Sequence, residues 1–248
     1  MKILASLFLA LALLVPYNTA FSANIQSDFE NKVIKVLKKN PNLLLELVDK
    51  AAQERHEKQM ASQLNDSIEN PVSPKIDSDR LLFGESKPEI VFVEYTSFQC
   101  GFCAQSKNLI EQIFKEHDGQ IGLYIKHMPH SEAGKAEAKM FEALRIHSNK
   151  AARIFFGYAY DNMQSFKENH EKAINSFLDY AQGEGWIDKE KVLNSYKSKK
   201  VEQLIESDLE EAKKFEFTGT PAFVINGVKI EGMQNKSLFD KAIEATTK

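Results

Sequence analysis

The sequence predicts an α/β protein in which a helical block separates two groups of strands. Residues 90–96 form an almost continuously apolar run, as in a strand that is buried on both faces. A helical pattern comes next, and a second strand pattern covers 121–128. The pattern is helical almost throughout 131–209, and strand patterns return at 222–225 and 228–231. Two strands are therefore expected before the block and two after it.

The first 22 residues have the features of a secretory signal peptide. Lys2 precedes an apolar run from Ile3 to Val15, which is shorter than the roughly 20 residues that a transmembrane helix needs. We expect cleavage after Ser22, with Ala23 as the alternative site. An uncleaved membrane anchor is the competing interpretation. The prediction is export to the periplasm, in association with the cell envelope.

Residues 24–80 are expected to form a separate helical segment and a linker. Two amphipathic stretches meet at Asn40-Pro41, a capping residue and then a proline that favours the first helical position. Short amphipathic helices cannot bury their apolar stripes alone, so they must pack on the rest of the chain or on other copies. A polar connector with Pro71 and Pro74 separates them from residues 81–248. This favours a homo-oligomer over docking within one chain.

The remaining elements are expected within residues 81–248. The helix after the first strand should run to about His117, where Asp118-Gly119 starts a turn. A strand-helix-strand order predicts that the two strands are parallel. Five apolar stripes at helical spacing should form the core of the block at 131–209. Asn226-Gly227 between two apolar runs predicts a tight hairpin, and a last helix should end the chain.

The chain contains two cysteines, Cys100 and Cys103, and carries 32 Lys and Arg against 35 Asp and Glu. This balance gives no sign of a nucleic-acid-binding protein. Cysteines so close together cannot join distant parts of a fold, and in an oxidising compartment they are better suited to redox chemistry. A zinc site would need two more ligands. The nearest histidines, His127 and His130, are expected at the surface, so we predict no metal and no dissociable cofactor.

Two motifs carry a resemblance to a known fold. Cys100-Gly101-Phe102-Cys103 comes after the first strand, and Thr218-Gly219-Thr220-Pro221-Ala222 precedes the hairpin, an order that resembles the thioredoxin fold. The large helical block makes the chain similar to the DsbA-like thiol-disulfide oxidoreductases. The expected fold is thus thioredoxin-like with a helical insertion, preceded by an N-terminal helical segment. That segment is similar to the oligomeric branch that includes the suppressor-of-copper-sensitivity isomerases and the Com-one-type surface antigens.

The resemblance assigns roles to the cysteines. Cys100 would be the attacking cysteine, because a sulfur at the start of a helix faces unpaired backbone N–H groups that stabilise a thiolate. Cys103 would resolve the mixed disulfide. The strongest oxidants of the family carry Pro-His between the cysteines, whereas this chain has Gly101-Phe102, so strong oxidation is not implied. Gly101 and Phe102 would lie against the substrate.

Two further site residues come from the resemblance. Pro221 matches a proline that is cis in this fold, and Thr220 would offer its backbone to an extended substrate. An ordinary turn proline is the alternative. Glu94 lies six positions before Cys100, where the family has an acid that relays protons, and Lys126 is its expected partner. The alternative for Glu94 is a carboxylate at a strand end that reaches into solvent.

The function implied is an exported enzyme that forms or isomerises disulfides in other exported proteins. It would act through a mixed disulfide at Cys100 that Cys103 resolves, and a membrane redox partner would reset the cysteines. The direction of electron flow is open, and the N-terminal helices favour isomerase or mixed activity. The alternative is a non-catalytic periplasmic chaperone, or a copper-binding protein that uses the same pair, since soft thiolates suit monovalent copper.

Overall fold

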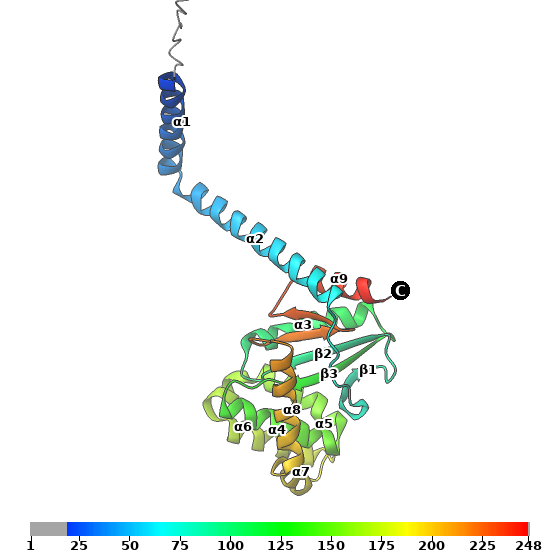
Figure 1. Ribbon diagram of the computed structural model, residues 1–248. Coiled ribbons are helices and arrows are strands. Elements are labelled where there is room, and N and C mark those ends of the chain that lie inside the picture. Colours follow the sequence, from blue (N-terminus) through cyan, green and yellow to red (C-terminus); the bar gives the residue numbers. More distant parts are fainter. Residues whose placement is uncertain (1–18, 248) are drawn as a thin grey trace, which may run out of the picture. The chain divides into compact units, whose positions relative to one another are not determined.

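The computed structural model describes residues 19–247, and it divides into one unit up to Lys58 and a second, larger unit from Gln59 onward (Figure 1). The predicted signal peptide lies outside the described residues except for 19–22. The signal peptide and its cleavage site therefore remain predictions.

Two helices, α1 (Thr19–Lys39) and α2 (Pro41–Glu69), precede the larger unit's first strand. The break predicted between them is confirmed, since α1 ends at Lys39 and α2 begins at Pro41. The side-chain amide of Asn40 donates to the carbonyl of Val36 in α1 at 3.0 Å. The helix α2 is longer than its apolar pattern indicated, because the polar stretch after residue 53 stays helical. Leu64 and Ser67 near its end are buried, and the Ser67 hydroxyl accepts a hydrogen bond from the backbone of Lys229.

Five strands form one sheet in the order β1-β3-β2-β4-β5. Strands β2 and β3 are parallel, as predicted, and the other neighbours are antiparallel. The strand β1 was not expected from the sequence, because it is four residues long and lies at the edge of the sheet. The bounds are β1 Leu81–Gly84, β2 Ile90–Thr96, β3 Ile121–His127, β4 Ala222–Ile225 and β5 Val228–Glu231.

A block of five helices is inserted between β3 and β4, as predicted. Most of these helices begin where a side chain accepts a hydrogen bond from an unpaired backbone N–H group, as Ser131, Ser148 and Ser198 do. The insertion consists of α4 Glu132–His147, α5 Asn149–Asp161, α6 Met163–Gly183, α7 Lys189–Tyr196 and α8 Lys199–Lys214. Two more helices, α3 Gly101–Glu116 and α9 Lys236–Thr246, complete the domain, together with a short 3₁₀ turn at Ser78–Arg80.

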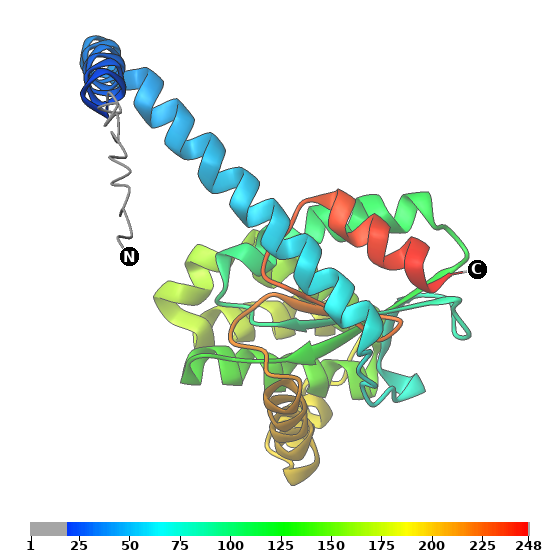
Figure 2. The same cartoon turned by 45° about the horizontal axis from the view of Figure 1, so that its top comes forward.

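Residues of β2 alternate between two apolar clusters. On one face Phe92 stacks on Phe239 of α9, with ring centroids 6.1 Å apart. On the other face Tyr95 packs against Phe215 and Phe217, beyond the end of α8. Helices α3 and α9 lie side by side (Figure 2), and Lys236 pairs with Glu116 between them. The sheet is therefore buried on both sides, which explains the continuously apolar pattern of β2.

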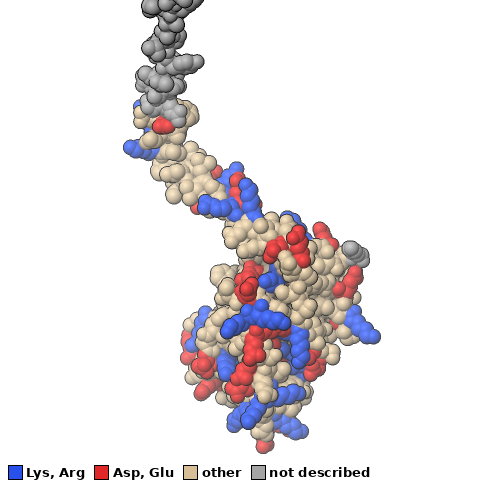
Figure 3. Space-filling model, in the orientation of Figure 1, with Lys and Arg blue, Asp and Glu red and all other residues tan. Residues whose placement is uncertain are grey.

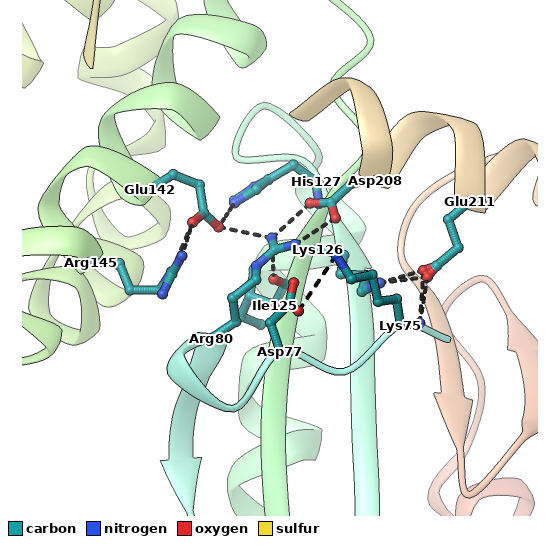
Figure 4. Close-up of polar contacts among 10 residues, drawn as sticks. All are labelled: Lys75, Asp77, Arg80, Ile125, Lys126, His127, Glu142, Arg145, Asp208 and Glu211. Atoms are coloured by element: carbon teal, nitrogen blue, oxygen red, sulfur yellow. Dashed lines mark hydrogen bonds and ion pairs between the residues drawn. The ribbon is translucent and has the colours of Figure 1, made fainter. Parts of the chain in front are cut away.

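The connector between α2 and β1 is held against the domain. The backbone N–H of Val72 donates to the carbonyl of Gly227 at 2.9 Å, and that of Lys75 donates to Glu211 at 2.9 Å. At the end of the connector the guanidinium of Arg80 is buried between Asp208 and Glu142, at 2.6 and 2.9 Å (Figure 4). The polar composition of this segment thus reflects specific contacts with the domain.

No helix within residues 19–247 is both long enough and apolar enough to cross a bilayer. On the face of the domain drawn in Figure 3, basic and acidic side chains are interspersed. This distribution agrees with the near balance of charges in the sequence.

Candidate active site

Cys100 lies at the boundary between the loop after β2 and the first turn of α3, where it is the N-terminal capping residue. The residues Ser97 to Gln99 form the loop, and the backbone N–H of Cys100 donates to the carbonyl of Ser97 at 3.0 Å. Cys100 is half-buried and Cys103, one turn further along α3, is fully buried. Both thiols are free. The predicted arrangement of one accessible and one buried sulfur is therefore present.

The pKa values of the two thiols are shifted in opposite directions. The pKa of Cys100 is lowered from 9 to about 5, chiefly by a hydrogen bond from the Cys103 thiol and further by Thr220 and the N–H groups at the start of α3, against the effect of burial. Burial raises the pKa of Cys103 well above its usual value, and the hydrogen bond to Cys100 and the charge of Glu94 act in the same direction. At neutral pH Cys100 is a thiolate and Cys103 a thiol, which is the division that an attacking and a resolving cysteine require.

Pro221 and Thr220 lie directly beside this pair. The Thr220–Pro221 peptide bond is cis. The carbonyl oxygen of Thr220 is 3.3 Å from the sulfur of Cys100, although the two residues are far apart in the sequence. Pro221 is buried and Thr220 is half-buried. The structure thus brings the second predicted motif onto the first.

Glu94 is completely buried in β2, on the face that packs against α3. One of its carboxyl oxygens, Oε1, accepts hydrogen bonds from the hydroxyls of Thr96 at 3.1 Å and Ser106 at 3.0 Å. The other oxygen, Oε2, has no hydrogen-bond partner within the described residues. Burial raises the pKa of Glu94 from 4.5 to about 7, because the two hydroxyls compensate only in part. Its carboxyl group can therefore gain or lose a proton near neutral pH.

The predicted partner of Glu94 is wrong. Lys126 is opposite Tyr95 in the register of β2 and β3, whereas Glu94 is opposite Ile125. Successive side chains of a strand point to opposite faces, so Lys126 lies on the other side of the sheet from Glu94. There its ammonium group binds Glu211 of α8 at 2.5 Å. The hydrogen-bond partners that the structure gives Glu94 are hydroxyl groups and not cations.

Three residues that the sequence did not single out surround Glu94 and Cys103. The Thr96 hydroxyl donates to Glu94, and it also lowers the pKa of Cys103 against the larger effect of burial. The Ser106 hydroxyl is also 2.7 Å from the carbonyl oxygen of Cys103. The hydroxyl of Tyr160 in α5 is 2.6 Å from Thr96. The spacing Glu94-x-Thr96 on one strand face was an available signal for Thr96, but nothing in the sequence pointed to Tyr160.

His127 and His130, the two histidines nearest to the cysteines in the sequence, differ in their burial. His127 was expected at the surface, but it is fully buried and its Nε2 is 3.0 Å from Glu142 of the cluster in Figure 4. The prediction for His127 is wrong because Phe141 and Glu142 of α4 contact its ring, which the local pattern could not show. His130 is exposed, as expected, and its Nε2 is 3.1 Å from the hydroxyl of Thr220.

The dipeptide between the cysteines is open to solvent. Phe102 is 60% exposed, and a Cβ at Gly101 would have no atom within 4 Å. An exposed phenylalanine ring offers apolar contact to a partner protein, and it supplies no hydrogen bond to the sulfurs. The position fits the predicted contact with substrate, which stays a prediction.

The rest of the described structure offers no competing centre. Within residues 19–247 no group of three or more His, Cys, Asp or Glu side chains is arranged to hold a metal ion. An apolar cavity of about 330 Å³ lies between α3, α5 and the edge of the sheet, and it is lined by residues such as Phe83, Ile110 and Phe156. Neither cysteine lines it.

Comparison with known proteins places this site in a family. A family model described as Thioredoxin matches residues 77–245. Curated relatives include the Na(+)/H(+) antiporter NhaA of Herminiimonas arsenicoxydans, 26% identical over 179 residues. That match covers 72% of this chain and 27% of the antiporter, and a similar one to NhaA 1 of Mycobacterium sp. (strain KMS) covers 28%. The chain thus spans little more than a quarter of the length of these relatives.

Solved structures show the same fold over nearly their whole length. The crystal structure of Wolbachia pipientis alpha-DsbA1 is similar with a TM-score of 0.57 at 20% identity, covering 73% of this chain and 96% of that one. Proteus mirabilis ScsC in a transitional conformation is similar with a TM-score of 0.53 at 18% identity, covering 91% and 98%. Since the family model matches well over half of the residues, the chain belongs to this thioredoxin family and has a DsbA-like fold.

Proposed function

We propose that the protein is an exported thiol-disulfide oxidoreductase that forms or isomerises disulfides in other exported proteins. The proposal rests on the pKa values of two thiols one helical turn apart, which are shifted in opposite directions. The pKa of Cys100 is lowered to about 5, and that of Cys103 is strongly raised. A thiolate that is accessible and a thiol that is buried can act in succession on one substrate.

In the reducing direction, the Cys100 thiolate attacks one sulfur of a substrate disulfide. A Cys100–substrate disulfide forms, and the other substrate sulfur leaves as a thiolate. Cys103 then loses its proton and attacks the sulfur of Cys100, which releases the second substrate thiolate and leaves a Cys100–Cys103 disulfide. Two electrons pass from the protein to the substrate. The reverse sequence forms a disulfide in the substrate and returns both cysteines to the reduced state.

Glu94 is the group best placed to accept the proton of Cys103 in this scheme. Its charge acts on Cys103 and raises the pKa of that thiol, and its own pKa of about 7 suits proton transfer near neutral pH. The Thr220 carbonyl lies beside the sulfur of Cys100, so an extended substrate segment would align along the Thr220 backbone.

The experiment uses single cysteine variants. Cys100→Ala should abolish insulin reduction and the repair of scrambled substrates. Cys103→Ala should retain the first attack and accumulate mixed disulfides, which mass spectrometry of the trapped complexes would identify. Full activity of Cys100→Ala would exclude the proposal. A chain without redox activity, whose Cys100→Ala variant still suppresses aggregation as the wild type does, would instead support the chaperone alternative.

Self-association through the N-terminal helices is part of the proposal. In the unit that ends at Lys58, α1 and the first half of α2 carry exposed apolar side chains at helical spacing, including Val33, Val36, Leu44, Leu47 and Val48. Such a stripe marks a surface that packs on another protein surface. Light scattering should give a multimer for the mature chain and a monomer for a Leu44→Glu, Leu47→Glu variant. A monomeric mature chain would remove this support for isomerase activity.

Export to the periplasm and a membrane redox partner complete the proposal. The apolar run at residues 3–15 supports export, and a thiol pair that cycles between two states needs a protein that resets it. Fractionation of cells that express the full chain should recover a processed form from the periplasm. Recovery of the unprocessed chain from the cytoplasm would contradict this assignment.

A further inference from the structure

His130 reaches the active site through Thr220. It lies in the connection between β3 and α4, exposed to solvent, and its Nε2 is 3.1 Å from the hydroxyl oxygen of Thr220. The two residues come from segments that are far apart in the sequence. His130 itself makes no contact with either sulfur in the hydrogen-bond network of the described residues, so any effect on the cysteines must pass through Thr220.

Thr220 is in turn a neighbour of the Cys100 sulfur. Its carbonyl oxygen is 3.3 Å from that sulfur, and its side chain contributes to the lowered pKa of Cys100. The carbonyl can only accept a hydrogen bond, so it favours the thiol. The hydroxyl can donate one, so it favours the thiolate. The direction of the hydroxyl hydrogen therefore decides whether Thr220 stabilises the thiolate.

A hydroxyl group has a single hydrogen to donate. If Nε2 of His130 carries a hydrogen and donates it to Thr220, the hydroxyl hydrogen is free to point at the sulfur of Cys100. If Nε2 is the unprotonated nitrogen of the ring, it accepts the hydroxyl hydrogen, and the thiolate then faces oxygen lone pairs. A negative charge on Cys100 favours the first arrangement. The two residues are coupled through this one hydrogen.

We propose that His130 is a positioning residue that donates to the Thr220 hydroxyl and thereby directs its hydrogen to the Cys100 thiolate. The proposal deepens the proposed function by assigning the control of thiolate stability to a residue outside both motifs. Phe102, between the cysteines, offers no hydrogen-bond donor on its side chain. Stabilisation of the thiolate by side chains thus depends on Cys103 and on Thr220, whose hydroxyl His130 holds in place by a side-chain hydrogen bond.

The test titrates the Cys100 thiolate by its ultraviolet absorbance in reduced full-length protein. His130→Ala should raise the pKa of Cys100 by about one unit, a tenfold change in the thiolate equilibrium. The dithiol–disulfide equilibrium with glutathione should shift about tenfold towards the disulfide, which corresponds to about 30 mV. His130→Gln, whose amide can still donate to Thr220, should retain most of the wild-type titration.

The double variant decides whether His130 acts through Thr220. Thr220→Val removes the hydroxyl and should raise the pKa of Cys100 by itself, and adding His130→Ala to it should change nothing more. Additive effects, or an unchanged titration in His130→Ala, would overturn the proposal. His147→Ala is the matched control, because His147 is also exposed and its Nε2 is 2.8 Å from the hydroxyl of Ser195. The His147→Ala variant should leave the pKa of Cys100 unchanged.

These outcomes are separate from those of the proposed function. The titration and the glutathione equilibrium report on the isolated protein and need no protein substrate. A chain that fails to reduce insulin or to repair scrambled substrates would refute the proposed function and leave the coupling of His130 to Cys100 measurable.

Discussion

Glu94 and Glu142 are both fully buried carboxyl groups, yet their surroundings are opposite. Glu142 lies between the guanidinium groups of Arg80 and Arg145, and these charges, with His127, hold its pKa far below the usual value despite burial. Glu94 has hydroxyl groups as its hydrogen-bond partners, and its pKa rises to about 7. A carboxylate paired with cations stays ionised and fixes the fold, whereas one without them remains free to exchange a proton.

The largest effect on stability should come from breaking the buried ion pairs that Arg80 makes with Glu142 and Asp208. Arg80→Ala leaves Glu142 and Asp208 without their shared guanidinium, and loss of one partner from a buried ion pair costs about 3–5 kcal/mol of unfolding free energy. Urea denaturation would measure it. The exposed pair of Lys191 and Asp188 provides the control, since Lys191→Ala should leave the midpoint unchanged. A midpoint for Arg80→Ala equal to that of the wild type would contradict the structural role of the cluster.

The second effect is the pH dependence of stability. The pKa of Glu94 is raised in the folded protein, so the unfolded chain loses its proton first as the pH rises from 4.5 to about 7. Over this interval the carboxyl group is ionised in the unfolded chain but stays protonated in the folded protein. The free energy of unfolding therefore falls, by on the order of 3 kcal/mol. Glu94→Gln should remove this loss, and its stability relative to the wild type should rise between these pH values.

Glu142 has the opposite dependence, because its pKa is lowered by folding. Its contribution to stability is present above the pKa of the unfolded chain and is lost as the pH falls towards the folded pKa. Denaturation curves across a pH series would show both trends. A parallel pH dependence in Glu94→Gln and the wild type would contradict the contrast between the two carboxyl groups.

The third effect concerns the reaction. Glu94→Gln should slow the release of substrate from the mixed disulfide by about a hundredfold, the lower range for general acid–base catalysis, and leave the first attack by Cys100 unchanged. Single-turnover kinetics with a labelled peptide would separate the two steps. Equal release rates in the variant and the wild type would remove Glu94 from the mechanism.

The smallest effect tests the link between Glu94 and Cys103. Thr96→Val keeps the shape of the side chain and removes the hydroxyl, so release from the mixed disulfide should slow by about tenfold, the value of one hydrogen bond. Tyr160→Phe removes only the outer hydroxyl of this chain of groups and should have a weaker effect. If Tyr160→Phe slowed release more than Thr96→Val, the order of the groups would be wrong.

Local patterns predicted the elements that are strongly apolar or bounded by clear turns. The strands β2, β4 and β5 lie where the runs at 90–96, 222–225 and 228–231 predicted them, because buried strands and the Asn226-Gly227 turn leave distinct signals. The edge strand β1 was missed because only one of its four residues, Leu82, is buried. The pairing of Glu94 with Lys126 failed because the register of two parallel strands places them on opposite faces.

The sequence alone determined the chemistry and its local setting: two thiols one turn apart, the first at the start of a helix that comes after a buried strand, with an acid inside that strand. Spacing and periodicity carry this information because they depend on neighbouring residues. Only the tertiary structure decided which groups act on the thiols. Tyr160 and His130, which the sequence did not place at the site, come from separate segments, and their contacts depend on how the helical insertion and the hairpin pack around β2 and α3.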